Sequence, residues 1–159
     1  MNTDAASGSH SAIPQQDLAR EIGQSLVAAA PDGWAMLTYE TFGVVGLQEA
    51  TLQVTLADGA TQWLRPPPPA ATLAHELRQV MYREGAGTWF SARFTLTHPE
   101  SLDASFNYAD EPPWDTPIDP THYARELDKF PRGDRATPQW LRQRTAGVAA
   151  TPTQGGPVS

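Results

Sequence analysis

The 159-residue sequence contains no cysteine, and this absence removes several kinds of site at once. Disulfide bonds, thiolate zinc sites and cysteine nucleophiles all need a thiol, so none of them is open to the chain. Residues 1–11 hold no basic residue and no apolar run, which a secretory leader would need. No stretch of about 18 apolar residues occurs, so we expect no membrane-spanning helix and a cytoplasmic location.

Positive charge is also scarce, because 18 Asp and Glu stand against 11 Lys and Arg and give a net charge of −7. Most of the excess lies in one stretch without Lys or Arg, formed by Glu100, Asp103, Asp110, Glu111, Asp115 and Asp119. This balance disfavours direct binding to nucleic acid, whose phosphates would repel the chain, and favours a basic protein partner. The stretch is equally compatible with a solvated loop.

No catalytic or metal-binding motif is complete in the sequence. His75-Glu76 begins like a His-Glu-x-x-His zinc motif, but Gln79 stands where the second His is required. Three prolines interrupt the aspartates of residues 110–119, which an EF-hand calcium loop does not tolerate. Nucleophile elbows, phosphate-binding loops and dinucleotide fingerprints are missing. We therefore predict no metal, no cofactor and no enzymatic activity, and rank hydrolysis by paired carboxylates as the least implausible chemistry.

The ends of the chain lack the apolar periodicity of packed elements. Residues 1–12 are rich in Ser and Ala, and residues 145–159 are rich in Gly, Pro, Thr and Ala and carry no charged side chain. We predict a disordered arm over 1–12, a single domain with one core over 13–144, and a disordered tail over 145–159.

Apolar spacing predicts the elements of the first half. Leu18, Ile22 and Leu26 indicate a helix over 14–30. Alternation indicates strands over 34–39, 51–56 and 61–65, with a short strand or turn at 43–46. Four prolines, 66–69, predict a stiff connector in preference to a ligand for proline-reading domains. A second helix begins near Leu73 and closes near Gly85 or Gly87.

In the second half, alternation predicts two antiparallel strands over 88–96 and 102–108. Asp119-Pro120 is a typical helix start, Pro131 and Gly133 end that helix, and a final helical turn spans 138–142. The sum is an α+β fold with a mainly antiparallel sheet of about five to six strands. An N-terminal helix, a middle helix and a C-terminal helical cap pack with this sheet.

Aromatic side chains on strand patterns are expected in the core: Trp34, Trp63, Trp89, Phe90, Phe94 and Phe106. Trp114 differs, because it lies in an irregular acidic segment bounded by prolines. It either folds back as a plug on the domain or projects as an anchor for a partner, and aromatic anchors surrounded by charge are common in tight interfaces.

An ordered set of residues in the second half resembles the YezG-like immunity proteins, small acidic antitoxins that accompany polymorphic bacterial toxins. The set is Phe106-Asn107-Tyr108, Asp110 with Trp114, Tyr123, Glu126-Leu127, Phe130-Pro131-Arg132, and Pro138 with Trp140-Leu141. The likeness covers residues 89–142. It implies a protein without an active site that binds a secreted toxin domain.

The acidic stretch and the resemblance together predict which residues bind the partner, a cognate toxin of basic character. They are Asp103, Asn107, Asp110, Glu111, Trp114, Asp115 and Asp119. The alternative is a non-catalytic interaction or chaperone-like accessory module of a secretion system. The free protein is expected to be a monomer or a weak dimer.

Overall fold

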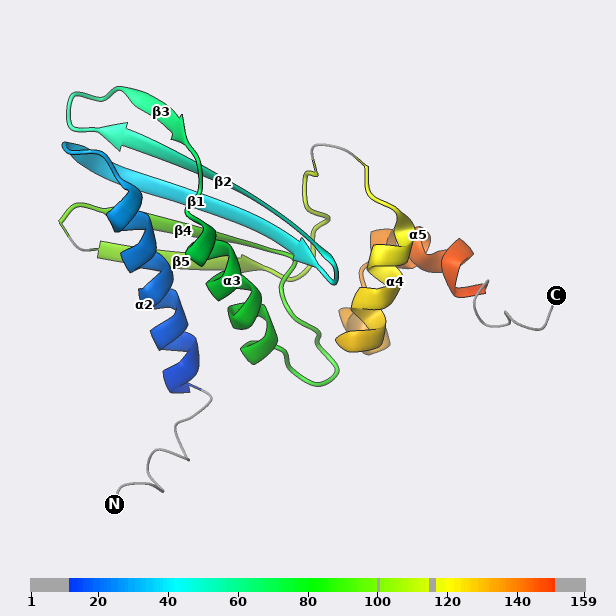
Figure 1. Ribbon diagram of the computed structural model, residues 1–159. Coiled ribbons are helices and arrows are strands. Elements are labelled where there is room, and N and C mark those ends of the chain that lie inside the picture. Colours follow the sequence, from blue (N-terminus) through cyan, green and yellow to red (C-terminus); the bar gives the residue numbers. More distant parts are fainter. Residues whose placement is uncertain (1–11, 100, 115–116, 151–159) are drawn as a thin grey trace, which may run out of the picture. The chain divides into compact units, whose positions relative to one another are not determined.

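The computed structural model describes residues 12–99, 101–114 and 117–150 (Figure 1). In chain order, the elements are α2 (Ala12–Ala29), β1 (Trp34–Val44), β2 (Leu47–Leu56), β3 (Thr61–Leu64), α3 (Pro68–Val80), β4 (Ser91–Thr97), β5 (Ser101–Asn107), α4 (Pro120–Lys129), the 3-10 helix η1 (Asp134–Ala136) and α5 (Gln139–Ala150). In these ranges, four α-helices and a five-stranded antiparallel sheet confirm the predicted α+β class. None of the described helices has the apolar length that a bilayer-spanning segment requires.

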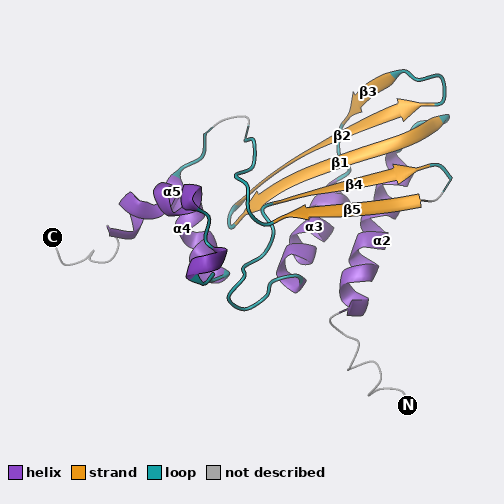
Figure 2. Cartoon of the chain, turned by 180° about the vertical axis from the view of Figure 1, so that it is seen from behind, coloured by secondary structure: helices purple, strands orange, loops and turns teal. Residues whose placement is uncertain are grey.

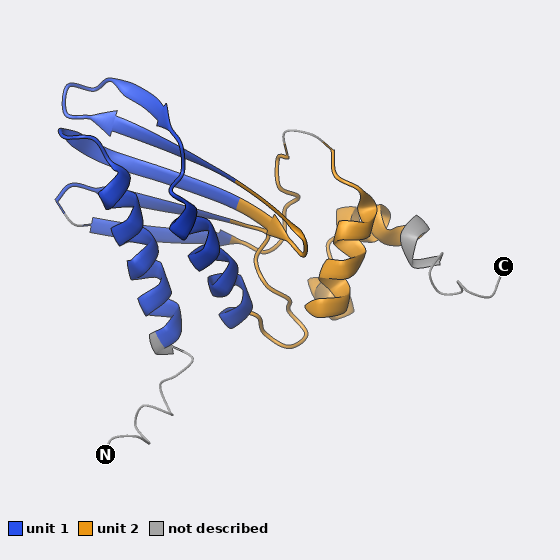
Figure 3. Ribbon diagram, in the orientation of Figure 1, with its two compact units in different colours: residues 1–41, 50–81, 92–106 blue, residues 42–49, 82–91, 107–159 orange. Residues whose placement is uncertain are grey.

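The chain divides into two compact units (Figure 3). Unit 1 comprises residues 1–41, 50–81 and 92–106, and unit 2 comprises residues 42–49, 82–91 and 107–159. Each unit is thus built from segments far apart in the sequence. The sequence predicted a single core, whereas each unit has its own set of buried apolar side chains.

The sheet has the strand order β3-β2-β1-β4-β5, and in unit 1 helices α2 and α3 lie side by side on one of its faces (Figure 1, Figure 2). The alternation of β1 explains this arrangement, because Leu37 and Tyr39 are fully buried while Met36, which precedes them, is exposed. From α2, the predicted Ile22 and Leu26 are also fully buried. The predicted alternation of β4 is confirmed as well, since Ala92, Phe94 and Leu96 are buried.

The proline run forms the start of a helix, which corrects the predicted connector over 66–69. Pro68 and Pro69 are the first residues of α3, where their missing N–H groups would have no intrahelical acceptor in any case. The helix ends at Val80, before the predicted glycines. Its buried face is formed by Ala70, Ala74, Leu77 and Arg78, whereas Val80 is 42% exposed.

The edges of the sheet differ most from the sequence prediction. Trp63 was expected in the core but is 69% exposed, because β3 is an edge strand of four residues. At the other edge, β5 exposes its side chains from Ser101 to Ser105. Strand β4 begins at Ser91 and not at residue 88, so Trp89 and Phe90 are buried outside the strand.

In unit 2, helices α4 and α5 contact each other around an apolar cluster. Val44, Phe90, Tyr123 and Leu141 are its buried members, and Leu47, Trp114, Ile118, Leu127 and Trp140 pack against it. The predicted helix start is confirmed, since Pro120 occupies the first turn of α4 and the Asp119 carboxylate accepts a hydrogen bond from the Thr121 N–H at 2.9 Å.

Helix α5 is longer than the single turn predicted over 138–142, and it continues to Ala150. Thr145 is buried in it, and its hydroxyl donates to the Leu141 carbonyl at 2.9 Å, which satisfies the polar group inside the helix. The predicted disordered tail was therefore wrong over 145–150, and residue 12, assigned to the arm, begins α2. The other residues of both predicted disordered ends, 1–11 and 151–159, lie outside the described residues.

Candidate partner-binding segment

The residues predicted to bind a partner fall in both units. Asp103 lies on β5 in unit 1, and Asp115 lies outside the described residues. The other five belong to unit 2 and to one stretch, residues 107–119, which we call the acidic segment: Asn107, Asp110, Glu111, Trp114 and Asp119.

Asn107 fixes the beginning of the acidic segment through its side-chain amide. Its Oδ1 accepts hydrogen bonds from the N–H groups of Ala109 at 3.1 Å and Asp110 at 2.8 Å. Its Nδ2 donates to the Asp110 carbonyl at 2.8 Å and to the Ser91 hydroxyl at 3.0 Å. An Asn side chain that mimics a turn in this way holds the chain reversal after β5. The role of Asn107 is therefore structural, because its side chain bonds to the backbone of the acidic segment itself.

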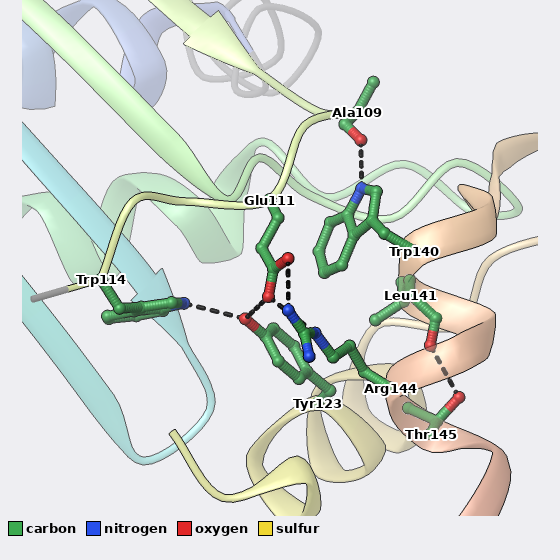
Figure 4. A network of polar contacts seen from close by, with 8 residues as sticks. All are labelled: Ala109, Glu111, Trp114, Tyr123, Trp140, Leu141, Arg144 and Thr145. Carbon is green, nitrogen blue, oxygen red and sulfur yellow. Dashed lines mark hydrogen bonds and ion pairs between the residues drawn. The ribbon is translucent and has the colours of Figure 1, made fainter. Parts of the chain in front are cut away.

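Glu111 is held by two other elements of unit 2 (Figure 4). Its Oε2 accepts a hydrogen bond from the Tyr123 hydroxyl of α4 at 3.0 Å. Arg144 of α5 donates to both carboxylate oxygens, with Nε–Oε2 at 2.9 Å and Nη2–Oε1 at 3.0 Å. This bidentate geometry is the one that a guanidinium and a carboxylate prefer. The carboxylate of Glu111 thus joins the acidic segment to both helices.

The tyrosine at the centre of this network is kept neutral. Burial raises the pKa of the Tyr123 hydroxyl to about 12, and the Glu111 carboxylate acts in the same direction, against the opposing effect of the Trp114 N–H. A neutral hydroxyl keeps its proton and can therefore donate a hydrogen bond to the Glu111 carboxylate. The hydrogen bonds to Glu111 in turn raise the pKa of Arg144 above its ordinary value.

Trp114 folds back onto unit 2, which decides between the two roles that its sequence context left open. Its Nε1 donates to the Tyr123 hydroxyl at 2.9 Å (Figure 4). Its ring is T-shaped to that of Phe42, with centroids 6.0 Å apart. It packs against the buried cluster that includes Tyr123. The side chain is a plug on unit 2, and its contacts are internal to the fold.

Trp140 is a residue of this segment's environment that the sequence did not single out as functional. Its Nε1 donates to the Ala109 carbonyl at 2.6 Å (Figure 4). Its ring is T-shaped to those of Phe90 and Tyr123, with centroids 5.1 and 5.4 Å away. The only sequence signal was its place in the ordered set that resembles the immunity family. The beginning of the acidic segment is thus tied to α5.

Asp119 also has a structural role, at the other end of the acidic segment. Besides the Thr121 N–H, its carboxylate accepts the Thr121 hydroxyl at 3.0 Å. The N–H first and the hydroxyl second hold the pKa of Asp119 below its ordinary range. The predicted residues with exposed side chains in the described chain and no such role are Asp103 in unit 1 and Asp110 in unit 2.

A buried carboxylate and a half-buried guanidinium support unit 2 and escaped the sequence prediction of a site. Glu126 is fully buried, and its carboxylate accepts the Val45 N–H at 3.0 Å. Arg132 donates to the carbonyls of Tyr108 at 2.9 Å and of Thr88 and Ala136 at 2.7 Å, and its guanidinium lies 4.4 Å from the Phe90 ring centroid. No local spacing indicates these long-range contacts.

Metal-ligating side chains do not converge in the described part of the chain. No group of three or more His, Asp and Glu side chains is placed there to hold a metal ion. The histidine rings meet other partners: His122 contacts the Val45 carbonyl at 3.2 Å, and His98 packs edge-on against Trp34 at 5.0 Å. A hollow of about 690 Å³ in unit 1 includes Trp34 and His98 in its wall, and among the described residues that line it Asp32 is the one carboxylate.

Comparison of the chain with models of known protein families and with curated proteins finds no match.

Proposed function

We propose that this chain is an immunity protein that binds and neutralises a cognate secreted toxin domain in the cytoplasm, by contact and without catalysis. The resemblance of residues 89–142 to YezG-like immunity proteins gives the class of partner. The observation that carries the proposal further is the set of contacts that residues 107–114 of the acidic segment make. Asn107, Glu111 and Trp114 each bond to other residues of unit 2 and hold this stretch in place.

Residues 107–114, held in this way, present the Asp110 carboxylate with a smaller ordering cost on binding. Fixing a loop before association saves the entropy that a flexible loop would lose in the complex. Asp110 is exposed immediately beside the Asn107 turn, and its backbone is bonded on both sides by that amide. A preset carboxylate suits a basic toxin surface, because complementary charge speeds the encounter and rejects wrong partners.

The structure changes which residues are proposed to contact the toxin directly. Trp114, Glu111, Asn107 and Asp119 act within unit 2, so they support the surface and do not form it. The direct contact within the acidic segment is assigned to its exposed carboxylate Asp110.

An immunity function requires a toxin gene beside this one, so the probe is the variable C-terminal domain of the large upstream reading frame that we expect there. We expect the purified full chain to suppress that domain's activity at equimolar ratio and to bind it with an association rate that falls as salt rises. Asp110→Asn should associate roughly threefold more slowly at low salt. Glu84→Gln removes the same charge from another exposed position of unit 2 and should associate as the wild type does.

Equal slowing by both variants would assign the effect to net charge alone and remove Asp110 from the interface. No binding between the toxin domain and the wild-type chain would overturn the immunity function. Binding to a secretion component instead would favour the accessory-module alternative.

A further inference from the structure

Strand β3 lies at an edge of the sheet (Figure 1, Figure 2), and among the described residues β2 is its only strand neighbour. The pairing runs antiparallel from Leu52 opposite Leu64 to Thr55 opposite Thr61. The Leu56 N–H donates to the Ala60 carbonyl at 2.7 Å, so these two residues are a hydrogen-bonded pair. Because such pairs alternate along an antiparallel ladder, the backbone groups of Thr61 and Trp63 point away from β2. They are available to a further strand.

Trp63 gives this open edge an apolar surface. It stands opposite Gln53 of β2. The two neighbours of Gln53 along β2, Leu52 and Val54, are fully buried on the helix-covered face of the sheet. The period of two therefore places Trp63 on the face away from the helices, where it is 69% exposed. A large aromatic side chain in water beside unpaired backbone groups is typical of an interaction site.

The opposite edge of the sheet carries a protection that β3 lacks. Strand β5 has the exposed Asp103 in its course, and a charge on an edge strand disfavours pairing with another strand. The four residues of β3, Thr61–Leu64, include no charged side chain. Pairing at β3 therefore places no charge against the incoming strand.

The residues that flank β3 have opposite charges, and this favours a second copy of the same strand as the occupant. Asp58 precedes the strand and Arg65 follows it, and both are exposed. A two-fold antiparallel arrangement reverses the direction of the second copy, so each Arg65 comes beside the other copy's Asp58. With the two-fold axis at Gln62, Trp63 stands opposite Thr61, and the two Trp63 rings lie on one face as diagonal neighbours.

We infer that the chain forms a homodimer in solution through antiparallel pairing of β3 with β3 of a second copy. The interface contains the outward backbone groups of Thr61 and Trp63, the two Trp63 rings, and two ion pairs between Asp58 and Arg65. Because β3 is short, its pairing buries less surface than the interface of a stable dimer. The dimer is therefore weak, and its population depends on concentration. The inference does not rest on the proposed function.

Sedimentation equilibrium of the full chain from about 1 to about 500 µM tests the pairing, since mass action populates a weak dimer at the upper end. The wild type should pass from monomer to dimer within this range. Trp63→Ala and Arg65→Glu should each raise the dissociation constant by at least about tenfold. Ser105→Lys places a charge on the opposite edge strand, β5, and should leave the dissociation constant unchanged.

Mixing two impaired variants distinguishes a broken interface from a damaged fold. Arg65→Glu brings two carboxylates together at each flank of the paired strands, and Asp58→Lys brings two cations together there, so each variant alone should stay monomeric. A mixture of the two restores opposite charges at both flanks, and a heterodimer should form with about the wild-type constant. Asp58 also accepts the Ala60 N–H at 2.9 Å, so melting curves accompany the Asp58→Lys sample.

A wild-type chain that remains monomeric at the highest concentration overturns the inference. So does a dimer that is insensitive to Trp63→Ala and Arg65→Glu, because its interface then lies elsewhere. Failure of the mixture to associate, with both variants folded, excludes the antiparallel charge pairing.

Discussion

The two units of this protein are stabilised by different kinds of side-chain contact. In unit 1, fully buried apolar side chains recur with the period of a strand or helix, as Leu37 and Tyr39 do on β1 and Ile22 and Leu26 on α2. In unit 2, individual polar and aromatic side chains join distant segments, such as Glu111 to Arg144 and Trp140 to Ala109.

Unit 1 is stabilised by features that a local sequence pattern encodes, whereas unit 2 is stabilised by specific contacts between segments distant in sequence. Burying a periodic apolar face against a neighbouring element needs only that the face be continuous. Holding an irregular segment needs a specific partner for each backbone or side-chain polar group, because unsatisfied buried groups are costly. Unit 1 should therefore respond to loss of apolar volume, and unit 2 to loss of single polar or steric contacts.

The largest effect is expected for Phe94→Ala in unit 1. The ring is fully buried and packs against Tyr39 and Phe106, with centroids 6.1 and 6.0 Å away. Its removal leaves a cavity and should lower the free energy of unfolding by about 4 kcal/mol. Trp63→Ala removes a larger ring from an exposed site, and in urea unfolding at about 1 µM protein it should change stability by no more than about 0.5 kcal/mol. Similar losses for both would contradict the burial assigned to the two rings.

A steric contact in unit 2 is tested by Gly87→Ala. Gly87 has a φ of +79°, and a Cβ there would lie 2.8 Å from Cγ of Arg132, whose guanidinium donates to three carbonyls. Displacing Arg132 and straining the backbone should together cost about 3 kcal/mol. Gly85 has nearly the same φ, +82°, and nothing within 4 Å of its Cβ position, so Gly85→Ala should cost only about 1 kcal/mol of strain.

The difference between these two alanine variants isolates the Arg132 contact from the backbone conformation. It is measured by urea unfolding under the same conditions. Equal losses would mean that Arg132 moves aside without cost and that its three hydrogen bonds do not hold unit 2.

Tyr123→Phe tests the polar centre of unit 2. The variant keeps the ring but leaves the Trp114 N–H and the Glu111 carboxylate without the hydroxyl, so unfolding free energy should fall by about 1 kcal/mol at neutral pH. Tyr82→Phe is the control, because its hydroxyl makes only a long, exposed contact with the Pro131 carbonyl at 3.4 Å. The control should change stability by less than about 0.5 kcal/mol.

The same hydroxyl predicts a loss of stability in alkali. The pKa of Tyr123 is about 12 in the folded chain and 10.0 in an ordinary tyrosine, so between these values the unfolded chain loses this proton first. Ionisation then favours unfolding, and stability should fall by about 1 kcal/mol from about pH 9 to about pH 11 on this account. Tyr39, whose pKa burial also raises to about 12, adds a similar loss. Tyr123→Phe should remove one of the two contributions, measured as urea midpoints across this pH range.

The sequence predicted those parts of the fold that depend on periodicity or capping. The α+β class, the buried faces of α2 and β4 and the Asp119-Pro120 start of α4 all follow from residues within a few positions of each other. The prediction that Trp63 is buried was wrong because alternation does not show that a strand lies at an edge of the sheet. The prediction that the tail begins at residue 145 was wrong because the Thr145 hydroxyl is satisfied within α5, which composition alone does not show.

The candidate site was less predictable for a related reason. The sequence located the acidic segment but not the partners of its side chains, since Glu111 meets Arg144 across 33 positions. Charge indicates a surface only when the charged group is left exposed, and Glu111 and Asp119 are engaged within unit 2. Trp114 could be assigned only after the positions of Phe42 and Tyr123 were known.

The smallest effect is expected for Arg144→Gln, and it distinguishes the surface of the unit 2 network from its interior. The side chain of Arg144 is 53% exposed and that of Glu111 is 27% exposed, so water and salt screen their attraction. Even a bidentate pair at such exposure should contribute only about 0.5 kcal/mol to unfolding free energy. The loss should shrink further in about 1 M salt, where the screening length is about 3 Å.

The Tyr123→Phe loss should persist in the same salt, because its hydroxyl is buried and neutral. Urea unfolding of both variants at low and high salt gives the comparison. A salt-independent Arg144→Gln loss of about 2 kcal/mol or more would show that the ion pair belongs to the interior of unit 2, since exposed pairs do not reach that size.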